Sequence, residues 1–406
     1  AGGKVTTPNY NVAVGVDSGG ANTEATGQYN VSVGTEAGYK LTTGADNTSI
    51  GTVAGKEVTT ASGNVGIGYL AGGVNATSTG SYNTSVGRAA GYAVTSGISN
   101  VFVGRAAGYA QTTGNYTVAV GEYAGVNITT GSNNIAIGKS ALHANQTASN
   151  NTVIGRNAGY DTTGAENTFV GAYSGEEVSS GASNTAVGYN SGGGASASAA
   201  TGDGNTALGH STLEAVTSGH SNVALGKNAM IAATTGHNNV AIGYQTLDAA
   251  TTSFYNVAVG SLALTANDTG NYNTAVGYGS LTTQSGDANY NTAVGYLAGE
   301  DVTTGDYNTF LGAFAGEEIT TSNGSTALGY GAGGGASAAD GTGEYNTSVG
   351  FKALEAVTTG DLNVAIGSNA LAANTVGDRS VAIGHNALPN ANPASNADTY
   401  NVAIGL

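Results

Sequence analysis

The sequence predicts an all-β fold, a parallel β-roll or β-solenoid of about 23 rungs with a 17-residue repeat, packed as a trimeric fibre. A motif of the form Tyr/Ser/Asn–Asn–Thr/Val–small–Val/Ile/Leu–Gly occurs 23 times in 406 residues, and one recurring interval accounts for 15 of the 22 spacings between its closing glycines. The chain contains 68 glycines and only 9% charged residues, against roughly a quarter in ordinary domains. A fixed short period of this kind is the signature of stacked repeats.

The motif itself predicts a short strand. In residues 290–295 (YNTAVG), Thr292 and Val294 alternate with Asn291 and Ala293. Alternation that includes β-branched residues is typical of a strand, and the closing glycine indicates a turn.

The second half of each repeat predicts a second short strand and a second turn. An aliphatic residue recurs seven positions after the motif glycine, as at Val302, and Thr303, Thr304 and Gly305 follow it. A 17-residue unit does not fold alone, because ordering its backbone costs roughly 1–2 kcal/mol per residue. We therefore expect successive rungs to stack and to pair their strands.

The oligomeric state is predicted from one face of the main strand. This face carries Asn and Ala or Ser in most copies, so it is small and flat, and we expect it to pack against copies of itself. A homotrimer is the natural arrangement that buries one face of each roll.

The repeat defines a single domain over residues 1–406, with the repeat proper from about 10 to 406. Residues 167–178 (NTFVGAYSGEEV) and 308–319 (NTFLGAFAGEEI) share eight of twelve residues at an offset of 141. The array therefore grew partly by duplication of a block.

Composition excludes several classes of protein. Without cysteine the chain has no disulfide framework and no Cys-ligated metal site. A net charge of −16 without a basic run argues against nucleic acid as a partner, and no apolar run reaches the length of a membrane span. We expect a non-enzymatic protein without a cofactor.

The repeat resembles a known family. Residues 380–387 (SVAIGHNA) nearly match the SVAIG-x-x-A signature of trimeric autotransporter adhesin heads, and residues 363–370 (NVAIGSNA) and 134–138 (NIAIG) are close variants. The resemblance implies a left-handed parallel β-roll, three of which pack side by side into a fibre. The chain differs in its longer interval, in the Asn that usually replaces the opening Ser, and in lacking a neck, stalk or anchor. Its Asn-Thr-Ala-Val-Gly-Tyr form is similar to repeats of bacteriophage tail fibres.

The position after the motif glycine predicts a ladder of surface contacts. It is the most variable and bulky position of the repeat, and it changes from basic to aromatic along the chain. Its side chains either contact a sugar or a neighbouring fibre, or they cover the turn or pack between subunits. The candidate ladder consists of Arg88, Arg105, Lys139, Arg156, Tyr244, Tyr278 and Tyr296.

Two further groups are candidates for metal binding. Glu300 and Asp301 lie one repeat before Glu317 and Glu318, so these acids form either a cation-binding ladder or a solvated turn. His220 and His237 lie one repeat apart and are expected to stack on adjacent rungs.

These observations predict a structural extracellular fibre, a rigid shaft and possible receptor-binding head of an adhesin or phage tail fibre. Two alternatives remain open. One is a filament subunit that polymerises end to end, which the absence of capping segments on the first and last repeats favours. The other is a glycan- or surface-binding solenoid. The expected partners are the chain itself and a cell-surface glycan or protein receptor.

Overall fold

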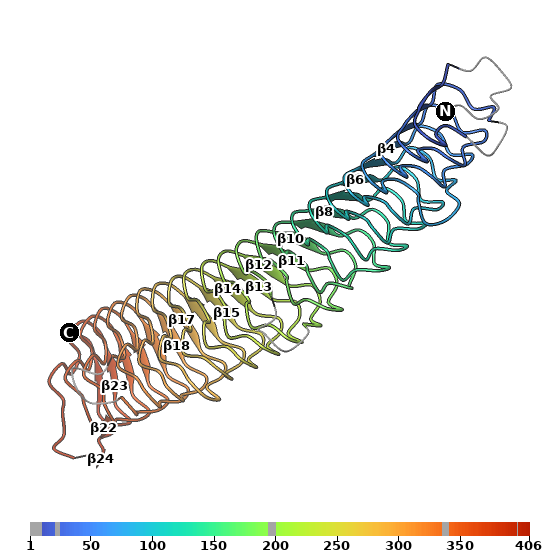
Figure 1. Ribbon diagram of the computed structural model, residues 1–406. Coiled ribbons are helices and arrows are strands. Elements are labelled where there is room, and N and C mark those ends of the chain that lie inside the picture. The colour runs from blue at the N-terminus through green and yellow to red at the C-terminus, as the bar shows by residue number, and fades with distance from the viewer. Residues whose placement is uncertain (1–9, 21–24, 194–199, 335–340, 396) are drawn as a thin grey trace. The chain divides into compact units, whose positions relative to one another are not determined.

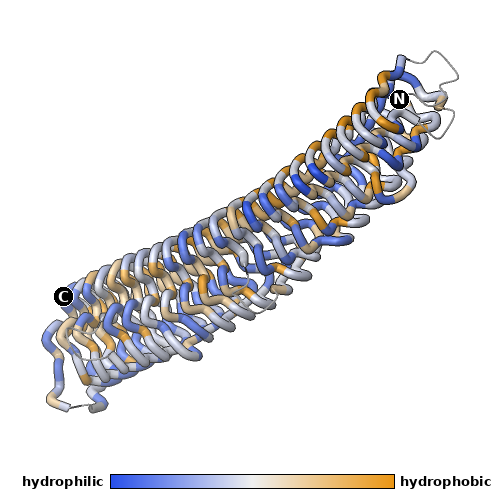
Figure 2. The backbone as a smooth tube through the Cα atoms, viewed as in Figure 1, coloured by the Kyte–Doolittle hydropathy of each residue, from blue (hydrophilic) through white to orange (hydrophobic). Residues whose placement is uncertain are grey.

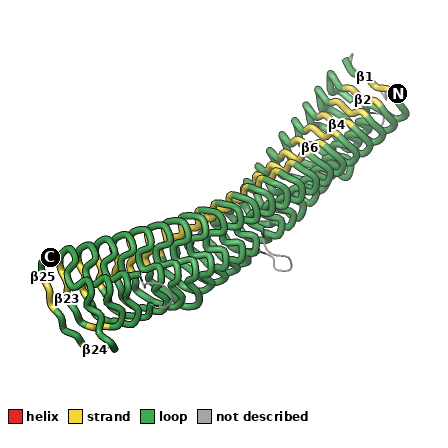
Figure 3. Tube along the Cα trace, turned by 90° about the vertical axis from the view of Figure 1, so that its left-hand side faces the viewer, coloured by secondary structure: helices red, strands yellow, loops and turns green. Residues whose placement is uncertain are grey.

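The computed structural model describes residues 10–20, 25–193, 200–334, 341–395 and 397–406. Contacts within the chain separate two compact units, Ala1–Gly204 and Asn205–Leu406. In each unit the described residues form a parallel β-solenoid, with one three-residue strand per rung and no helix (Figures 1 and 3). The prediction of an all-β solenoid, with its number of rungs and its repeat length, is confirmed. The trimer stays a prediction.

The first unit contains eleven described strands. They are β1 (Val12–Val14), β2 (Val31–Val33), β3 (Thr48–Ile50), β4 (Val65–Ile67), β5 (Thr84–Val86), β6 (Val101–Val103), β7 (Val118–Val120), β8 (Ile135–Ile137), β9 (Thr152–Ile154), β10 (Thr168–Val170) and β11 (Thr185–Val187).

The second unit contains twelve strands of the same kind and two shorter ones, β22 and β24, within its described residues. They are β12 (Thr206–Leu208), β13 (Val223–Leu225), β14 (Val240–Ile242), β15 (Val257–Val259), β16 (Thr274–Val276), β17 (Thr292–Val294), β18 (Thr309–Leu311), β19 (Thr326–Leu328), β20 (Thr347–Val349), β21 (Val364–Ile366), β22 (Gly377–Asp378), β23 (Val381–Ile383), β24 (Ala397–Asp398) and β25 (Val402–Ile404).

Within each unit, neighbouring strands pair in parallel and place the same motif position side by side. In β16 and β17, Thr274 pairs with Thr292. In β19 and β20, which are separated by a longer interval than most, Thr326 still pairs with Thr347. Insertions therefore change the loops and leave the strand register intact.

The face that carries Asn and Ala lies inside the roll. Asn291 and Ala293 are fully buried, whereas Thr292 and Val294 are only partly buried and point outwards. The expectation that the Asn/Ala face packs against another copy is wrong, because the chain encloses this face itself. A one-strand rung leaves a thin interior that suits small residues.

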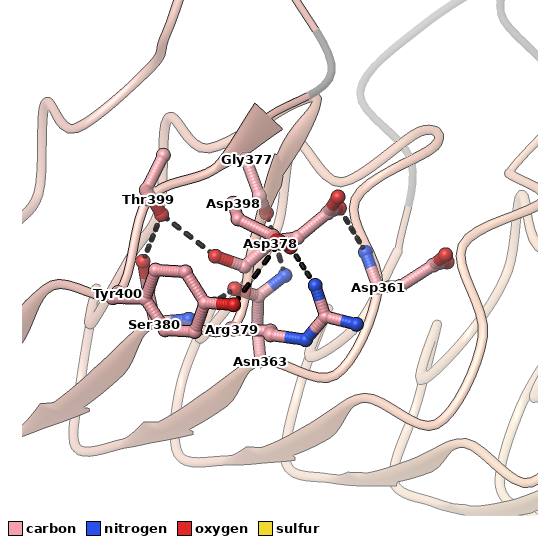
Figure 4. A network of polar contacts seen from close by, with 9 residues as sticks. All are labelled: Asp361, Asn363, Gly377, Asp378, Arg379, Ser380, Asp398, Thr399 and Tyr400. Carbon is pink, nitrogen blue, oxygen red and sulfur yellow. Dashed lines mark hydrogen bonds and ion pairs between the residues drawn. The ribbon is translucent and has the colours of Figure 1, made fainter.

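Buried asparagines form a ladder that ties one rung to the next. The side-chain Oδ1 of Asn291 accepts the backbone N–H of Asn308 at 2.9 Å, and its Nδ2 donates to the carbonyl of Gly305 at 2.7 Å. Figure 4 shows the same pattern near the C-terminal end of the second unit, where Asn363 accepts from Ser380 and donates to Gly377. Because a buried polar group is costly unless it is hydrogen-bonded, this ladder specifies the spacing of the rungs.

A second polar ladder runs two residues before the Asn ladder. In Figure 4 the backbone N–H of Asp361 donates to the Asp378 carboxylate at 2.8 Å. Arg379, which directly follows Asp378, forms an ion pair with Asp398 of the next rung. The Tyr400 hydroxyl donates to the same carboxylate at 3.0 Å. Side chains thus connect consecutive rungs even where the interval lengthens.

The prediction of a second strand in every repeat is wrong. In the described residues the second half of the repeat makes isolated parallel bridges, such as Val58 with Ser78, and a single pair of two-residue strands, β22 with β24. Backbone bonds still join the rungs there, as between Thr42 N–H and the Thr59 carbonyl at 3.0 Å. Left-handed residues precede this position, such as Val53 at φ 62°, and they coil the chain so that no extended strand forms. The aliphatic residues predicted at this position are nevertheless buried, Val58 and Val302 among them.

The interior is filled in two ways, which differ at the fourth residue after the motif glycine. In Gly-type rungs this residue is glycine, as at Gly125, and in many of them an aliphatic side chain such as Ile128 follows three residues later. In Leu-type rungs it is leucine or methionine, as at Leu264, and the residue three positions later is usually Ala, Asn or Gln. Hydrophobic segments recur at matching places in successive rungs of each unit (Figure 2).

Buried phenylalanines occur in Gly-type rungs. Phe102, Phe169 and Phe310 occupy the middle of a strand and are fully buried. A Cβ added at Gly108 would lie 2.2 Å from the ring of Phe102, so the missing side chain of this glycine makes room for the ring. No helix in the described part of the chain has the length and hydropathy that a membrane crossing requires.

Candidate interaction surface

The candidate contact ladder is produced by the corner that ends each strand. The motif glycine Gly104 has φ 129°, and a Cβ there would lie 2.5 Å from the carbonyl oxygen of Gly121 on the next rung. Only glycine fits this approach. The chain turns sharply at this corner, and the next side chain, Arg105, is exposed.

In the first unit the predicted basic residues share one column of consecutive rungs. Arg88, Arg105, Lys139 and Arg156 are all exposed. Glu122 lies between them, and its carboxylate is 3.0 Å from an Arg105 nitrogen and 3.5 Å from Lys139 Nζ. The column is therefore partly neutralised by its own acid.

Two of these arginines also contact aromatic rings one rung away. The Arg105 guanidinium lies 5.1 Å from the ring centre of Tyr123, and that of Arg156 lies 5.4 Å from that of Tyr173. Cation–π contacts of this geometry hold the side chains against the rung. These arginines thus cover the turn, which is one of the two predicted interpretations of the ladder.

In the second unit the same column carries aromatic rings on several rungs. The rings of Tyr278 and Tyr296 stack with centroids 5.5 Å apart and planes 13° apart. Tyr244 is exposed but separate from this pair, because Ser261 occupies the intervening rung. The row continues through three rings that are not among the candidate ladder residues, namely Phe314, Tyr330 and Phe351.

The four predicted acids lie together on two successive rungs. Burial and the neighbouring carboxylates raise the pKa of Glu317, and burial together with Asp301 raises the pKa of Glu300. The backbone N–H of Asp301 donates to the carbonyl of Glu317 at 3.0 Å. These acids repel one another. Among the residues that the structure describes, no group of three or more His, Cys, Asp or Glu is arranged to hold a metal ion.

The predicted stacking of the two histidines is confirmed. The rings of His220 and His237 lie 4.9 Å apart with planes 18° apart, and His237 stacks in turn on Phe254 at 5.2 Å. They belong to an aromatic column on the second turn of the rung.

Sequence reasoning missed two surfaces. The first is the outward sheet face, formed by the first and third residues of each strand, such as Val223 and Leu225 in β13 and Ile137 in β8. The alternation was recognised, but the side that faces inwards was assigned incorrectly. The second is a stack of tyrosines directly before the buried asparagines, and the recurring Tyr-Asn pair is the signal that could have found it.

The outward sheet face is apolar and exposed on each unit. Leu208 and Leu225 are 44% and 42% exposed, and Ile137 is 37% exposed. Parallel sheets are usually covered on both faces. Here one face is closed by the chain's own turns and the other is open to solvent. In comparisons with known proteins, no family model matches the chain, and no curated protein matches it significantly.

Proposed function

We propose that the chain is the repetitive shaft of an extracellular fibre, an adhesin or a phage tail fibre, that assembles side by side as a homotrimer. The observation that carries the proposal is the apolar sheet face, which repeats on every rung within each unit. A contiguous apolar patch of this kind favours burial against another protein. The resemblance of the SVAIG-type repeat to trimeric adhesin heads and to phage tail fibres supports the extracellular setting.

The chemistry of this face favours a second copy of the chain over an unrelated partner. Its first position holds Thr, Val or Ile and its third holds Val, Ile or Leu, as Thr206 and Leu208 do in β12. These short, mostly β-branched side chains make a flat surface with one repeat distance. Another copy has the same repeat distance, so contacts formed at one rung recur at the next.

Mechanical stiffness follows from the connections between rungs. Each described rung within a unit is joined to its neighbours by strand bonds, and most rungs also by the Asn ladder, as with Asn256 accepting the N–H of Asn273 at 2.9 Å. Because the strand bonds continue from rung to rung within each unit, none of the described rungs is an obvious hinge. This is a property suited to a shaft.

The native mass tests the proposal. Light scattering at two concentrations should give one species at three times 39.4 kDa, about 118 kDa. The variant Leu225→Glu should dissociate it, because three buried carboxylates would meet at the interface. The matched control is Leu362→Glu, which changes an equally exposed leucine (45%) outside the sheet face, at a position where Glu166 occurs naturally.

Other outcomes distinguish the alternatives. A single species at the monomer mass of 39.4 kDa at both concentrations would overturn the trimer. A mass that climbs with concentration and survives Leu225→Glu would favour the end-to-end filament.

A receptor-contact role is a second candidate, and the aromatic row of the second unit favours it. Tyr278, Tyr296 and Tyr330 are each about half exposed. Exposed aromatic faces bind the apolar faces of sugar rings. On a glycan array, Tyr296→Ala should reduce binding, whereas Tyr345→Ala, which removes an isolated exposed tyrosine, should not. Equal binding by the two variants would count against this role.

A further inference from the structure

Four tyrosines of the second unit form an uninterrupted stack on consecutive rungs. The ring centroids of Tyr255, Tyr272, Tyr290 and Tyr307 are successively 5.3, 4.9 and 5.1 Å apart, and successive planes differ by 15°, 2° and 3°. It is the longest run of stacked tyrosines among the described residues. The other stacked tyrosines there occur in pairs, such as Tyr92 with Tyr109.

The buried Asn ladder holds this stack in place. Each tyrosine directly precedes a ladder asparagine and has a left-handed backbone, with φ between 57° and 60°. The N–H of Asn291 is bonded to the Asn273 side chain at 2.9 Å, and that of Asn308 to the Asn291 side chain at 2.9 Å. Because these amides fix the distance between rungs, adjacent rings cannot drift apart.

The stack is accessible to oxidants and to water. Tyr255, Tyr272 and Tyr290 are 49%, 43% and 48% exposed, and Tyr307 is 63% exposed. Burial therefore does not hinder the loss of a phenolic proton when a ring is oxidised.

We propose that this stack is a site of oxidative cross-linking, at which neighbouring tyrosines join as dityrosine between successive rungs of one chain. A peroxidase-type one-electron oxidant, with hydrogen peroxide as the terminal acceptor, removes one electron and the phenolic proton from each of two tyrosines. The two phenoxyl radicals form a bond between their ortho carbons. The two ring hydrogens leave as protons when the phenols are restored. In sum, two tyrosines and one hydrogen peroxide give one dityrosine and two waters.

Geometry is what favours coupling at this stack. Two phenoxyl radicals must meet face to face within their lifetime, and the rings of adjacent rungs already lie 4.9 and 5.1 Å apart in nearly parallel planes. An isolated tyrosine, such as Tyr116 or Tyr345, instead depends on collision with another molecule. Links within the stack would join successive rungs covalently.

The experiment is to treat the purified full chain with peroxidase and hydrogen peroxide and to map the links by mass spectrometry. A protease that cleaves before aspartate places Tyr255 in residues 248–267, Tyr272 in residues 268–286 and Tyr290 in residues 287–300. Linked pairs of these neighbouring peptides, lighter by two hydrogens, are expected, and fragmentation of the pairs assigns the bond to the stacked tyrosines. A mixture of unlabelled and ¹⁵N-labelled chains should give pairs in which both peptides carry the same label.

Two double variants make the test specific. Tyr272→Phe with Tyr290→Phe keeps the aromatic rings but removes the coupling phenols, so the links within the stack should be lost. Tyr116→Phe with Tyr345→Phe removes two tyrosines that are at least as exposed, and the links should persist. The proposal is overturned if conditions that oxidise free tyrosine give no links within the stack, or if the linked pairs carry mixed labels.

Discussion

Gly-type and Leu-type rungs fill the same interior with the large side chain in different places. The described rungs of the first unit are Gly-type, except for the rung of Leu142. Most described rungs of the second unit are Leu-type. In the first type the volume comes from a residue such as Ile128, and in the second from a residue such as Leu264. The fold therefore fixes the total side-chain volume inside a rung, but not which position of the repeat supplies it.

The two types carry different local costs. Leu264 has φ 51°, a left-handed conformation that costs an L-residue roughly 1–2 kcal/mol, whereas Gly125 has φ 54° and no such steric cost. Leu-type rungs recover that cost by burying the side chain, which is complete at Leu264. Two Leu-type rungs also bury a valine at the later position, Val216 and Val357, and so combine both large residues.

Converting one type into the other without compensation should have the largest effect. Gly108→Leu places a side chain against the ring of Phe102, and we expect a loss of more than about 3 kcal/mol because overpacking displaces backbone. Adding Phe102→Ala makes the rung Leu-type, so the double variant should be more stable than Gly108→Leu alone. Denaturant unfolding of the three variants measures this. If the double variant lost as much unfolding free energy as the two single variants together, the idea that these two positions exchange side-chain volume would be contradicted.

Truncating a leucine should reveal the strain of Leu-type rungs. Leu264→Ala should destabilise by about 3 kcal/mol, as for other buried leucines. Leu264→Gly removes more side chain but also the left-handed strain, and should be about 1 kcal/mol more stable than the alanine variant. The alanine and glycine substitutions of Leu41 are the control. Leu41 is buried at the seventh position after its motif glycine, where the alanine variant is expected to be more stable than the glycine variant. Denaturant unfolding again supplies the free energies.

The Asn ladder is common to both types, and its removal should cost less than an emptied core. Asn256→Ala leaves the buried N–H of Asn273 without its acceptor, so we expect a loss of about 1–3 kcal/mol. Asn267→Ala removes the amide at the later position of a Leu-type rung, which donates to the Gly270 carbonyl at 3.0 Å. That carbonyl keeps its bond from Asn256, so the loss in unfolding free energy should be smaller. If both variants lost the same unfolding free energy, the Asn ladder would stabilise the fold no more than an ordinary buried amide does.

The repeat, the solenoid class and the buried aliphatic positions could be predicted because each rung repeats one short pattern. The direction of the strand faces could not, since period-two alternation separates Asn291 and Ala293 from Thr292 and Val294 without saying which pair is enclosed. Residue polarity pointed the wrong way, because amide burial becomes favourable only when the next rung supplies bonding partners. The site residues were placed correctly in columns, but which rings touch depends on rung spacing and on interruptions such as Ser261.

The smallest expected effect is a pH response of opposite sign in the two units. Burial lowers the pKa of His143 from 6.5, so protonation favours unfolding and its rung loses stability as the pH falls below 6.5. Burial and neighbouring acids raise the pKa of Glu317 above 4.5, so its rung gains stability as the pH falls from neutral towards 4.5. Each change should stay below about 1 kcal/mol, because both groups are largely solvated.

Amide hydrogen exchange on the intact chain, corrected for intrinsic rates, measures this contrast at two reporter bonds. They are Ala144 N–H to the Tyr160 carbonyl and Asp301 N–H to the Glu317 carbonyl. Between pH 7 and 5 the first should exchange more readily and the second less. Glu317→Gln should flatten the second response and leave the first unchanged, since the two groups lie in separate units. Responses of the same sign would instead indicate that the net charge of −16, which acts on the whole chain, governs stability in this range.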